Sequence, residues 1–343
     1  MKNKLEIQNY LTDSVERGVF CGCHVWMMDH GKSEYFIVGN KSVYPHKEIN
    51  DQQTIYDLAS LTKVIVTTPL ILKLIEKNLL SLDQPIQTIL PSFQSVQVTI
   101  EHLLTHTSGL PADTILPLDS QKPQILEAIY RLSSCLEPGK QIVYSDLGFI
   151  LLGEIIETIT RKSLSDLSKE WLFVPMEMEE TGYLPDQTWI QRCAPTEDSP
   201  LLKRVIRGTA HDRKCRMMQG VSGHAGVFST IYDLSHYAKM LLNGGKYKKQ
   251  TILQPESIAL LYQNRTPNVN GNRGIGFINS DPVPITPFHS KRAIMHTGFT
   301  GTSIMVDFDL ELAVIVLSNR IHPTRNNPLI LEWRNQLYEF LMK

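Results

Sequence analysis

Residues 56–71 read YDLASLTKVIVTTPLI, an apolar helical run with a serine near its start and a lysine three residues later. Positions i and i+3 share one face of a helix, so Ser60 and Lys63 are predicted to point the same way. Burying an ammonium is costly because the group must leave water. An apolar setting lowers the pKa of a lysine, which lets it take a proton from a neighbouring hydroxyl. The stretch therefore predicts a serine nucleophile with a lysine partner.

The S-x-x-K pattern is a weak signal when it stands alone. It occurs once in this chain, and roughly one or two matches are expected by chance for such a composition. A capping serine followed by a lysine whose ammonium reaches solvent explains the pattern equally simply. A helix start at Ser60 would also favour negative charge developing beside the hydroxyl. Motifs elsewhere in the chain must decide between the two interpretations.

Composition limits the class of protein. The chain has 343 residues, of which 42% are hydrophobic and 20% charged, which is typical of a soluble globular protein with one large domain or two. Its net charge of −1 gives no electrostatic reason to expect nucleic acid or an anionic membrane as a partner. We expect a small-molecule or peptide substrate instead. The oligomeric state does not follow from the sequence.

Cysteines and the N-terminal segment bear on the compartment. Five widely spaced cysteines do not form a disulfide framework, and they predict reduced thiols in a cytosolic protein. Apolar residues near the start recur at helical spacing, which predicts an amphipathic helix rather than a signal peptide. No run approaches 18 apolar residues, so no membrane span is expected. The predicted location is cytoplasmic, with export left open.

Periodicity predicts an α+β chain. Strands are expected at 20–29, 34–41, 291–297, 302–308 and 311–318. Helices are expected at 60–78, 99–106, 123–134, 145–160, 229–245 and 327–342, with a kink or a new segment at Pro69. Thr230 and Asp233 resemble a capping box at the start of one helix. This order predicts one central sheet built from both ends of the chain, flanked by N- and C-terminal helices, with a large helical insertion.

Two further motifs favour the interpretation of Ser60 and Lys63 as a catalytic pair. The segment PGKQIVYSDLGFILLGEIIE (138–157) places Tyr144 and Asp146 just before a buried helix. The segment IMHTGFTGTSIMVDF (294–308) places His296, Thr297 and Gly298 at the end of a strand. A glycine there would let a substrate backbone approach closely.

With these three motifs in order, the chain resembles the serine β-lactamase and penicillin-binding-protein superfamily, in its class C-like group. That group includes D,D-carboxypeptidases, D-aminopeptidases, esterases and muramyl-peptide amidases, and its motifs are S-x-x-K, Y-x-N and K-T-G or H-T-G. The resemblance extends from about residue 20 to residue 325. Segments 211–230 and 318–327 are most similar to a cell-wall-linked subgroup of bacterial hydrolases.

The resemblance implies a β-lactamase/transpeptidase-like fold in two parts. The expected sheet domain comprises residues 1–58 plus 215–343, and the mainly helical domain comprises 59–214. Their junction would hold the active site, with a mostly antiparallel sheet on one side.

The same resemblance implies the catalytic roles. Ser60 would be the nucleophile that forms an acyl-enzyme, and Lys63 and Tyr144 would share the proton transfers. The backbone N–H groups of Ser60 and Phe299 would form the oxyanion hole. The expected substrate-binding residues are Asp146, His296, Thr297, Gly298 and His224. No metal and no organic cofactor is implied.

Two positions depart from the family pattern. Asp146 stands where Asn is usual, and a carboxylate favours the ammonium form of Lys63 and shifts the proton transfers toward Tyr144. His296 stands where Lys is common, and neutral imidazole binds a carboxylate less strongly. Both changes are expected to disfavour penicillins and a free C-terminal D-Ala-D-Ala, unless they are tolerated variants.

Three functions remain open from the sequence. The first is a serine hydrolase of amide bonds in cell-wall-derived substrates, as a D-Ala peptidase or muropeptide amidase. The others are a carboxylesterase of the same fold and a catalytically silent penicillin-recognising protein. The intact set of Ser60, Lys63 and Tyr144 argues against the silent protein. The charge-rich segment 197–216 is expected to be a solvated loop, or else to bind an anionic sugar-peptide.

Overall fold

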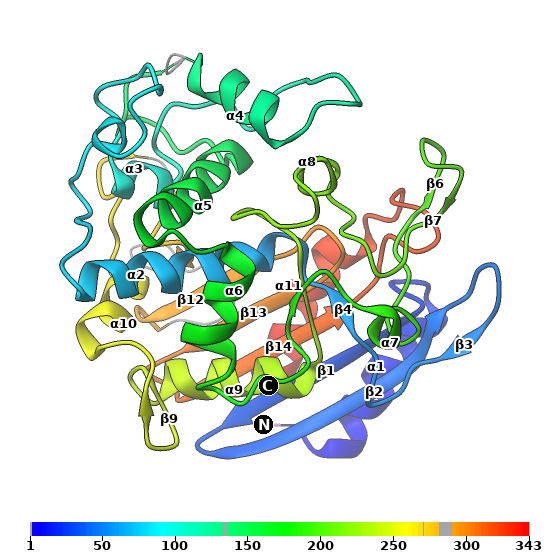
Figure 1. The fold of residues 1–343 in the computed structure, drawn as a ribbon. Helices are drawn as coiled ribbons and strands as arrows, with labels where there is room; N and C mark the ends of the chain where they lie inside the picture. Colours follow the sequence, from blue (N-terminus) through cyan, green and yellow to red (C-terminus); the bar gives the residue numbers. More distant parts are fainter. Residues whose placement is uncertain (1, 133–135, 270, 281–289, 343) are drawn as a thin grey trace.

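The centre of the fold is a seven-stranded antiparallel sheet (Figure 1). The computed structural model describes residues 2–132, 136–269, 271–280 and 290–342. The strand order is β11-β12-β13-β14-β1-β2-β3, and every neighbouring pair is antiparallel. The strands are β1 (Gly22–Asp29), β2 (Lys32–Ser42), β3 (Glu48–Ile49), β11 (Ile278–Asn279), β12 (Ala293–Thr297), β13 (Ser303–Asp307) and β14 (Leu312–Ser318). The five strands that periodicity predicts are thus confirmed, and the two ends of the chain build the sheet together.

Helices cover both faces of this sheet. On one face, α1 (Lys4–Glu16) and α11 (Leu329–Met342) share a core with alternate strand residues such as Val25 and Val314. On the other face, α9 (Ile231–Leu242) belongs to a core that contains Trp26 and Ile315. Successive side chains of a strand point to opposite faces, and both faces of β1 and β14 are covered by a core. This is why most residues of these two strands are apolar.

The insertion is mainly helical, as its sequence predicts. It contains α2 (Thr68–Glu76), α3 (Ile100–Leu104), α4 (Lys122–Tyr130), α5 (Asp146–Thr160) and α6 (Leu164–Ser168). The helix expected at 60–78 is divided: a 3₁₀ turn (Ala59–Leu61) and a π turn (Lys63–Thr67) precede α2. Pro69 lies in the first turn of α2, where its missing N–H costs no helical hydrogen bond. Pro69 therefore begins a new segment.

A second, three-stranded sheet connects the insertion to the rest of the chain. Its order is β4 (Tyr56–Asp57), β8 (Val227–Ser229) and β5 (Gly182–Tyr183). One continuous hydrophobic core also includes residues of the large sheet together with residues of α2 and α5. The division into 1–58 plus 215–343 and 59–214 therefore stays a prediction.

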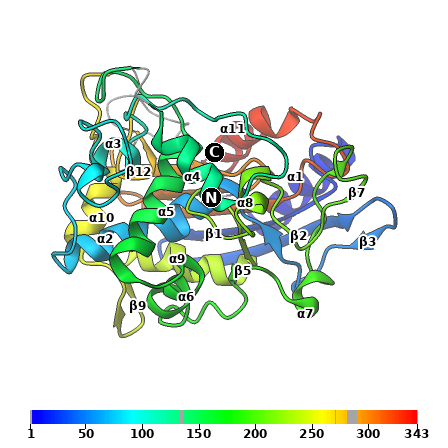
Figure 2. The ribbon, with the colours of Figure 1, turned by 45° about the horizontal axis from the view of Figure 1, so that its top comes forward.

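The irregular segment after β5 folds over one end of the molecule. It contains α7 (Gln187–Ile190), β6 (Asp198–Ser199), β7 (Arg204–Val205) and α8 (Arg213–Met217). Figures 1 and 2 both place α8 between α5 and the β6–β7 ribbon. The remaining elements are β9 (Lys246–Tyr247), β10 (Gln250–Thr251), α10 (Pro255–Tyr262), a 3₁₀ turn (Ile86–Thr88) and a π turn (Lys169–Phe173).

The start of α9 differs from its predicted cap. Thr230 Oγ1 accepts a hydrogen bond from the N–H of Asp233, as expected. The Asp233 carboxylate does not return the bond; it accepts from the N–H of Glu180 and the hydroxyl of Thr181, both at 2.7 Å. The capping box is therefore wrong in its second half. Asp233 instead ties the segment before β5 to α9, and burial raises its pKa to about 6.

Two expectations concern the compartment. The described cysteines, 21, 23, 193 and 215, are all free, and Cys135 lies outside the described residues. Among the helices of the described ranges, none has the length and apolar character needed to cross a bilayer.

Candidate active site

Ser60 lies in the 3₁₀ turn that directly follows β4. The preceding residue, Ala59, has a φ of +47°, in the left-handed region that residues other than glycine seldom adopt. Asp57 holds this conformation, because its Oδ1 accepts the N–H of Ala59 at 2.8 Å. Its Oδ2 accepts the N–H of His211 at 2.6 Å. The strained turn thus presents the Ser60 hydroxyl to a cleft and is fixed by a buried carboxylate.

Lys63 shares a face with Ser60, as the i, i+3 spacing predicts. Its side chain is fully buried, and Nζ donates to Ser60 Oγ at 3.1 Å and to the His224 carbonyl at 2.9 Å. Asp146 Oδ1 lies 2.7 Å from Nζ and forms an ion pair with it. The ammonium is therefore surrounded by three acceptors.

The charge state of Lys63 differs from the one that burial predicts. Burial lowers the pKa of Lys63, but the negative charge of Asp146, with a further contribution from Tyr144, outweighs it and raises that pKa above its usual value. The lowered pKa expected from the apolar stretch is therefore wrong. The expectation that Asp146 favours the ammonium is confirmed. In this state Lys63 donates protons and cannot accept one from Ser60.

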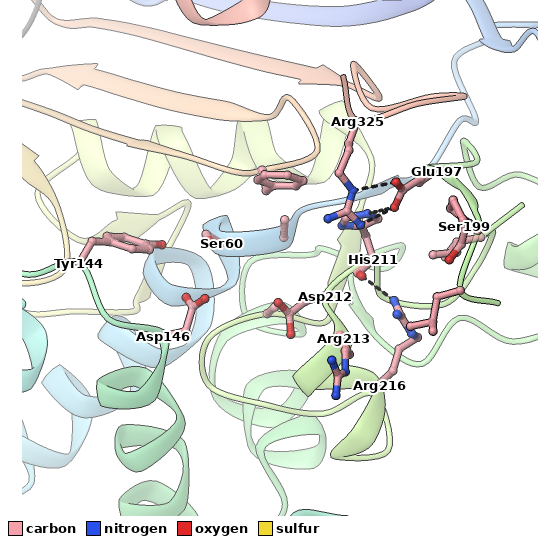
Figure 3. Close-up of a pocket in the computed structure, with 16 residues that line it drawn as sticks. Ser60, Tyr144, Asp146, Glu197, Ser199, His211, Asp212, Arg213, Arg216 and Arg325 are labelled. Atoms are coloured by element: carbon pink, nitrogen blue, oxygen red, sulfur yellow. Dashed lines mark hydrogen bonds and ion pairs between the residues drawn. The ribbon is translucent and has the colours of Figure 1, made fainter. Parts of the chain in front are cut away.

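Tyr144 is held in place by a histidine that lies under its ring. The ring of His106 stacks on Tyr144 with 4.4 Å between centroids, and His106 Nδ1 accepts the N–H of Ser145 at 3.0 Å. Lys63 Nζ lies 5.1 Å from the centre of the Tyr144 ring. Figure 3 shows the hydroxyl end of Tyr144 directed toward Ser60. His106 is therefore a positioning residue for Tyr144.

The third motif ends β12, but its histidine does not reach the cleft. His296 is 2% exposed, and its ring lies 6.2 Å from that of Tyr144. Burial, with the nearby cations of Lys63 and Arg273, lowers the pKa of His296 far below its ordinary value, so the imidazole is neutral. The expectation that His296 binds substrate directly is corrected on this ground. Thr297, in contrast, lines a pocket together with Ser60.

Gly298 is required by the packing of the protein itself. A Cβ at this position would lie 2.1 Å from Thr302 Oγ1 and 2.5 Å from the Leu58 carbonyl oxygen. The β12–β13 turn therefore packs directly against the segment between β4 and Ser60. Gly298 also lines the pocket that contains Ser60. The packing of the protein is thus a reason for the glycine by itself, and the close approach of a substrate backbone at Gly298 stays a prediction.

His224 supports the site from behind. Its side chain is 1% exposed, with Nδ1 2.8 Å from Ser222 Oγ and Nε2 2.8 Å from Asp212 Oδ1. Burial raises the pKa of Asp212, but the charge and hydrogen bond of His224 outweigh it and hold this pKa below its usual range. The expected substrate contact of the His224 side chain is therefore corrected. Its carbonyl, which binds Lys63, is what serves the site.

The predicted oxyanion hole has free donors. Among the backbone hydrogen bonds of the described residues, none is donated by the N–H of Ser60 or Phe299. Both residues line the two pockets that meet at the serine. Two such N–H groups can stabilise an oxyanion that forms beside Ser60. Their role stays a prediction.

Two pockets meet at Ser60. The larger has a volume of about 670 Å³ and extends from Tyr144 and Asp146 to a charged wall (Figure 3). That wall includes Glu197, His211, Asp212, Arg213, Arg216 and Arg325. The smaller pocket, of about 230 Å³, shares Ser60, Tyr144 and Phe299 with the larger one. The described part of the chain contains no cluster of three or more His, Cys, Asp or Glu suited to a metal ion.

The smaller pocket has a cationic lining that the motifs do not reveal. Arg320 and Arg334 line it and are 9% and 7% exposed. Within the described ranges neither has a carboxylate within ion-pair distance. Both donate to backbone carbonyls: Arg320 to Phe299 and Asn327, and Arg334 to Thr302 at 3.0 Å. Burial lowers the pKa of Arg334 to about 10, which leaves it charged at neutral pH.

Comparison with known proteins agrees with this geometry. Residues 7–337 match the family described as Beta-lactamase, and the chain belongs to that family. It is accordingly a β-lactamase-type serine hydrolase with the corresponding fold.

The individual relatives and solved structures share less than a third of their residues with this chain. A putative D-alanyl-D-alanine carboxypeptidase of Salmonella agona is 28% identical over 320 residues, covering 83% of this chain and 74% of the relative. Among solved structures, EstCE1, described as a hydrolase with promiscuous acyltransferase activity, has a TM-score of 0.77 at 22% identity, with 97% and 98% of the two chains covered. A β-lactamase/D-alanine carboxypeptidase of Yersinia pestis has a TM-score of 0.76 at 18% identity, and both chains are covered completely.

Proposed function

We propose that the protein is a carboxypeptidase-type serine hydrolase. It would cleave the last amide bond of a D-Ala-terminated, cell-wall-derived peptide through an acyl-enzyme on Ser60. The observation that carries this proposal is the smaller pocket, which Thr297, Arg320 and Arg334 line together with Ser60. Both arginines are buried, and among the described residues neither has a carboxylate within ion-pair distance. The name of the Salmonella agona relative supports the same substrate class.

The proton transfers follow from the charge state of the lysine. Lys63 is held as an ammonium by Asp146, so the Tyr144 oxygen, in its ionised form, takes the proton from Ser60 as Oγ attacks the substrate carbonyl. The N–H groups of Ser60 and Phe299 hold the oxyanion. When the amide bond breaks, Tyr144 returns the proton to the leaving amine. Water then attacks the ester by the same route, and Ser60 is released.

The leaving group explains the two buried arginines. A C-terminal residue released from the peptide carries a carboxylate, and guanidinium pairs with carboxylate through two parallel hydrogen bonds. Arg334 lines the smaller pocket, and its buried Nε has no hydrogen-bond partner among the described residues. The neutral His296 in place of lysine is then no obstacle to a free C-terminus, because the cation is supplied by Arg320 and Arg334. We also propose a reducing compartment, which fits the free cysteines, with recycled fragments as substrate.

The experiment compares one D-Ala-D-Ala peptide with its C-terminal amide, which has the same shape without the charge. At an effective dielectric near ~20, an ion pair at about 4 Å contributes up to ~4 kcal/mol. A third of this ion-pair energy corresponds to about tenfold in kcat/KM. The peptide with the free carboxylate should therefore be preferred over its amide at least tenfold. Arg334→Met should remove the preference and Arg334→Lys should keep part of it. Arg17→Gln, at the exposed arginine that follows the last residue of α1, is the matched control.

Two results would contradict the proposal. Equal rates for acid and amide in the wild type would show that no carboxylate is bound in the leaving-group pocket. Covalent labelling by a fluorophosphonate that survives in Ser60→Ala, measured by intact mass, would show that Ser60 is not the nucleophile.

A carboxylesterase is the second candidate, favoured by one feature. Asp146 is acceptor-only where the family pattern has an amide, and it lies beside Ser60 in the larger pocket. An ester makes no use of an amide donor there. Rapid turnover of phenyl acetate with no cleavage of the peptide acid would favour this function.

A further inference from the structure

The larger pocket has a cationic side that the proposed reaction does not use. Most charges around it are paired: Lys63 with Asp146 at 2.7 Å and Asp212 with His224 at 2.8 Å. Arg325 pairs with Glu197, with 2.7 Å between Nε and Oε1. The two arginines of α8, Arg213 and Arg216, remain. Across the described residues no carboxylate lies within ion-pair distance of either.

Neutral groups hold these two arginines in place. Arg216 Nη1 donates to the carbonyls of Ala210, at 2.7 Å, and His211. Arg213 Nη2 donates to the carbonyl of Leu116 at 2.6 Å. Carbonyls fix a guanidinium without cancelling its charge, and each guanidinium has five N–H donors, of which these contacts use few. The pocket therefore carries two oriented positive charges with donors to spare.

Hydrogen bonds and a ring contact hold the surrounding wall together. Asp57 accepts the N–H of His211, and His211 Nε2 lies 3.1 Å from Glu197 Oε2. The ring of His211 stacks on Phe299 at 5.5 Å, which connects this wall to the turn that carries the proposed oxyanion donor. Figure 3 shows His211, Arg216 and Arg325 on the side of the pocket away from Tyr144. Because the arginines are fixed relative to Ser60, they can position a substrate as well as attract it.

We propose that Arg213 and Arg216 bind a carboxylate on the acyl part of the substrate, so that the preferred substrate has an acidic acyl group. The proposal rests on acylation of Ser60 in the proposed function. Guanidinium is the side chain best suited to carboxylate, because its planar fork matches both oxygens. A volume of about 670 Å³ accommodates more than one residue of a peptide.

The position of the carboxylate on the acyl group is also restricted. Asp146 and Asp212 both line the pocket near Ser60. An anion next to the scissile carbonyl would meet these two like charges, whereas one farther along the acyl chain would meet Arg213 and Arg216. The preferred acyl group is therefore a peptide whose acidic side chain or free α-carboxylate is separated from the cleaved bond.

The test uses two D-Ala-D-Ala peptides that differ only in the acyl residue, glutamate linked through its side chain or the same residue with its α-carboxylate amidated. The wild type should prefer the free carboxylate at least tenfold in kcat/KM at low salt, and the preference should shrink as salt screens it. Arg213→Gln, and Arg213→Gln with Arg216→Lys, should bring the ratio toward one. Arg204→Gln should keep it, because Arg204 belongs to the same charged segment but does not line the pocket. Melting temperatures of all variants check their folding.

A second readout does not depend on peptidase activity. Each peptide is used to protect Ser60 from a fluorophosphonate, and the acidic peptide should protect at least tenfold better than the amidated one. If neither peptide is cleaved but the acidic one protects better, the proposed function fails and this inference stands. Equal protection by both peptides in the wild type, or a preference that persists in the Arg213 and Arg216 variants, would overturn the inference.

Discussion

Asp146→Asn should release Lys63 from its ammonium form. The variant keeps the size of the side chain and removes the charge that lies 2.7 Å from Nζ. At an effective dielectric near ~20, that separation corresponds to about 6 kcal/mol at most. Asp146 is 28% exposed, so solvent screens part of this energy. If about a third survives, ~2 kcal/mol remains, or about 30-fold in the equilibrium between ammonium and amine.

The expected result is a change in the pH dependence of acylation. With the opposing charge gone, burial favours the neutral amine, which can accept the Ser60 proton. The rate of acylation by phenyl acetate should rise about 10- to 30-fold near neutral pH, and its alkaline rise should begin at lower pH. Stopped-flow measurements across the pH range test this. Asp113→Asn is the matched control, because it removes a carboxylate that pairs with Lys214 at the neighbouring pocket.

Two outcomes would refute the reasoning. An unchanged pH profile would mean that the Asp146 charge does not set the protonation state of Lys63. A tenfold or greater loss of acylation would mean that the carboxylate itself takes part in proton transfer. Either result would return the question of the base to Tyr144 and Asp146 together.

Three other predictions follow from the geometry. Lys63→Ala and Tyr144→Phe should each slow acylation by about 10² or more, and the double variant should be far from additive in log rate, measured by single-turnover kinetics. Gly298→Ala should lower the melting temperature and cost about 1–3 kcal/mol, because its Cβ would clash with the Leu58 carbonyl and Thr302. Asp233 has a pKa raised to about 6, so its contribution to the free energy of unfolding is complete below pH ~4. About 3 kcal/mol of that contribution is lost as the pH rises from ~4 through the folded-state pKa of about 6. Asp233→Asn should therefore flatten the free energy of unfolding between pH 4 and 7 in urea titrations.

The parts of the site that the sequence predicts are those set by short-range geometry. Ser60 and Lys63 meet because positions i and i+3 share a helical face. The strands follow from alternation and continuous apolar runs, and their bounds differ from the predicted ones by a few residues. Caps and turns are less certain, as Asp233 shows, because a carboxylate can be used by a segment distant in sequence.

What the sequence could not predict depends on tertiary contact. Nothing local indicates that His106 stacks under Tyr144 or that Asp57 fixes the turn before Ser60. The burial of Lys63 is visible from its apolar neighbours, but local sequence does not show that Asp146, on another helix, sets its net pKa; only the resemblance to the family placed the two side by side. His296 illustrates the reverse case, because a residue in a recognised motif can be enclosed completely.

The distribution of charge around Ser60 has a consequence for which bond is cut. Arg320 and Arg334 line the smaller pocket and Arg213 and Arg216 line the larger one, and Ser60 lines both. Among the described residues none of these four arginines has a carboxylate within ion-pair distance. Asp146 lines the larger pocket together with Ser60, where it repels any anion placed over the reacting carbonyl. A peptide with a carboxylate at each end of a fixed spacing would bind in one register only. In that register the amide bond next to the C-terminal residue lies at Ser60, and a peptide lacking either carboxylate would lose rate as well as affinity, because binding energy from both ends positions the bond that reacts.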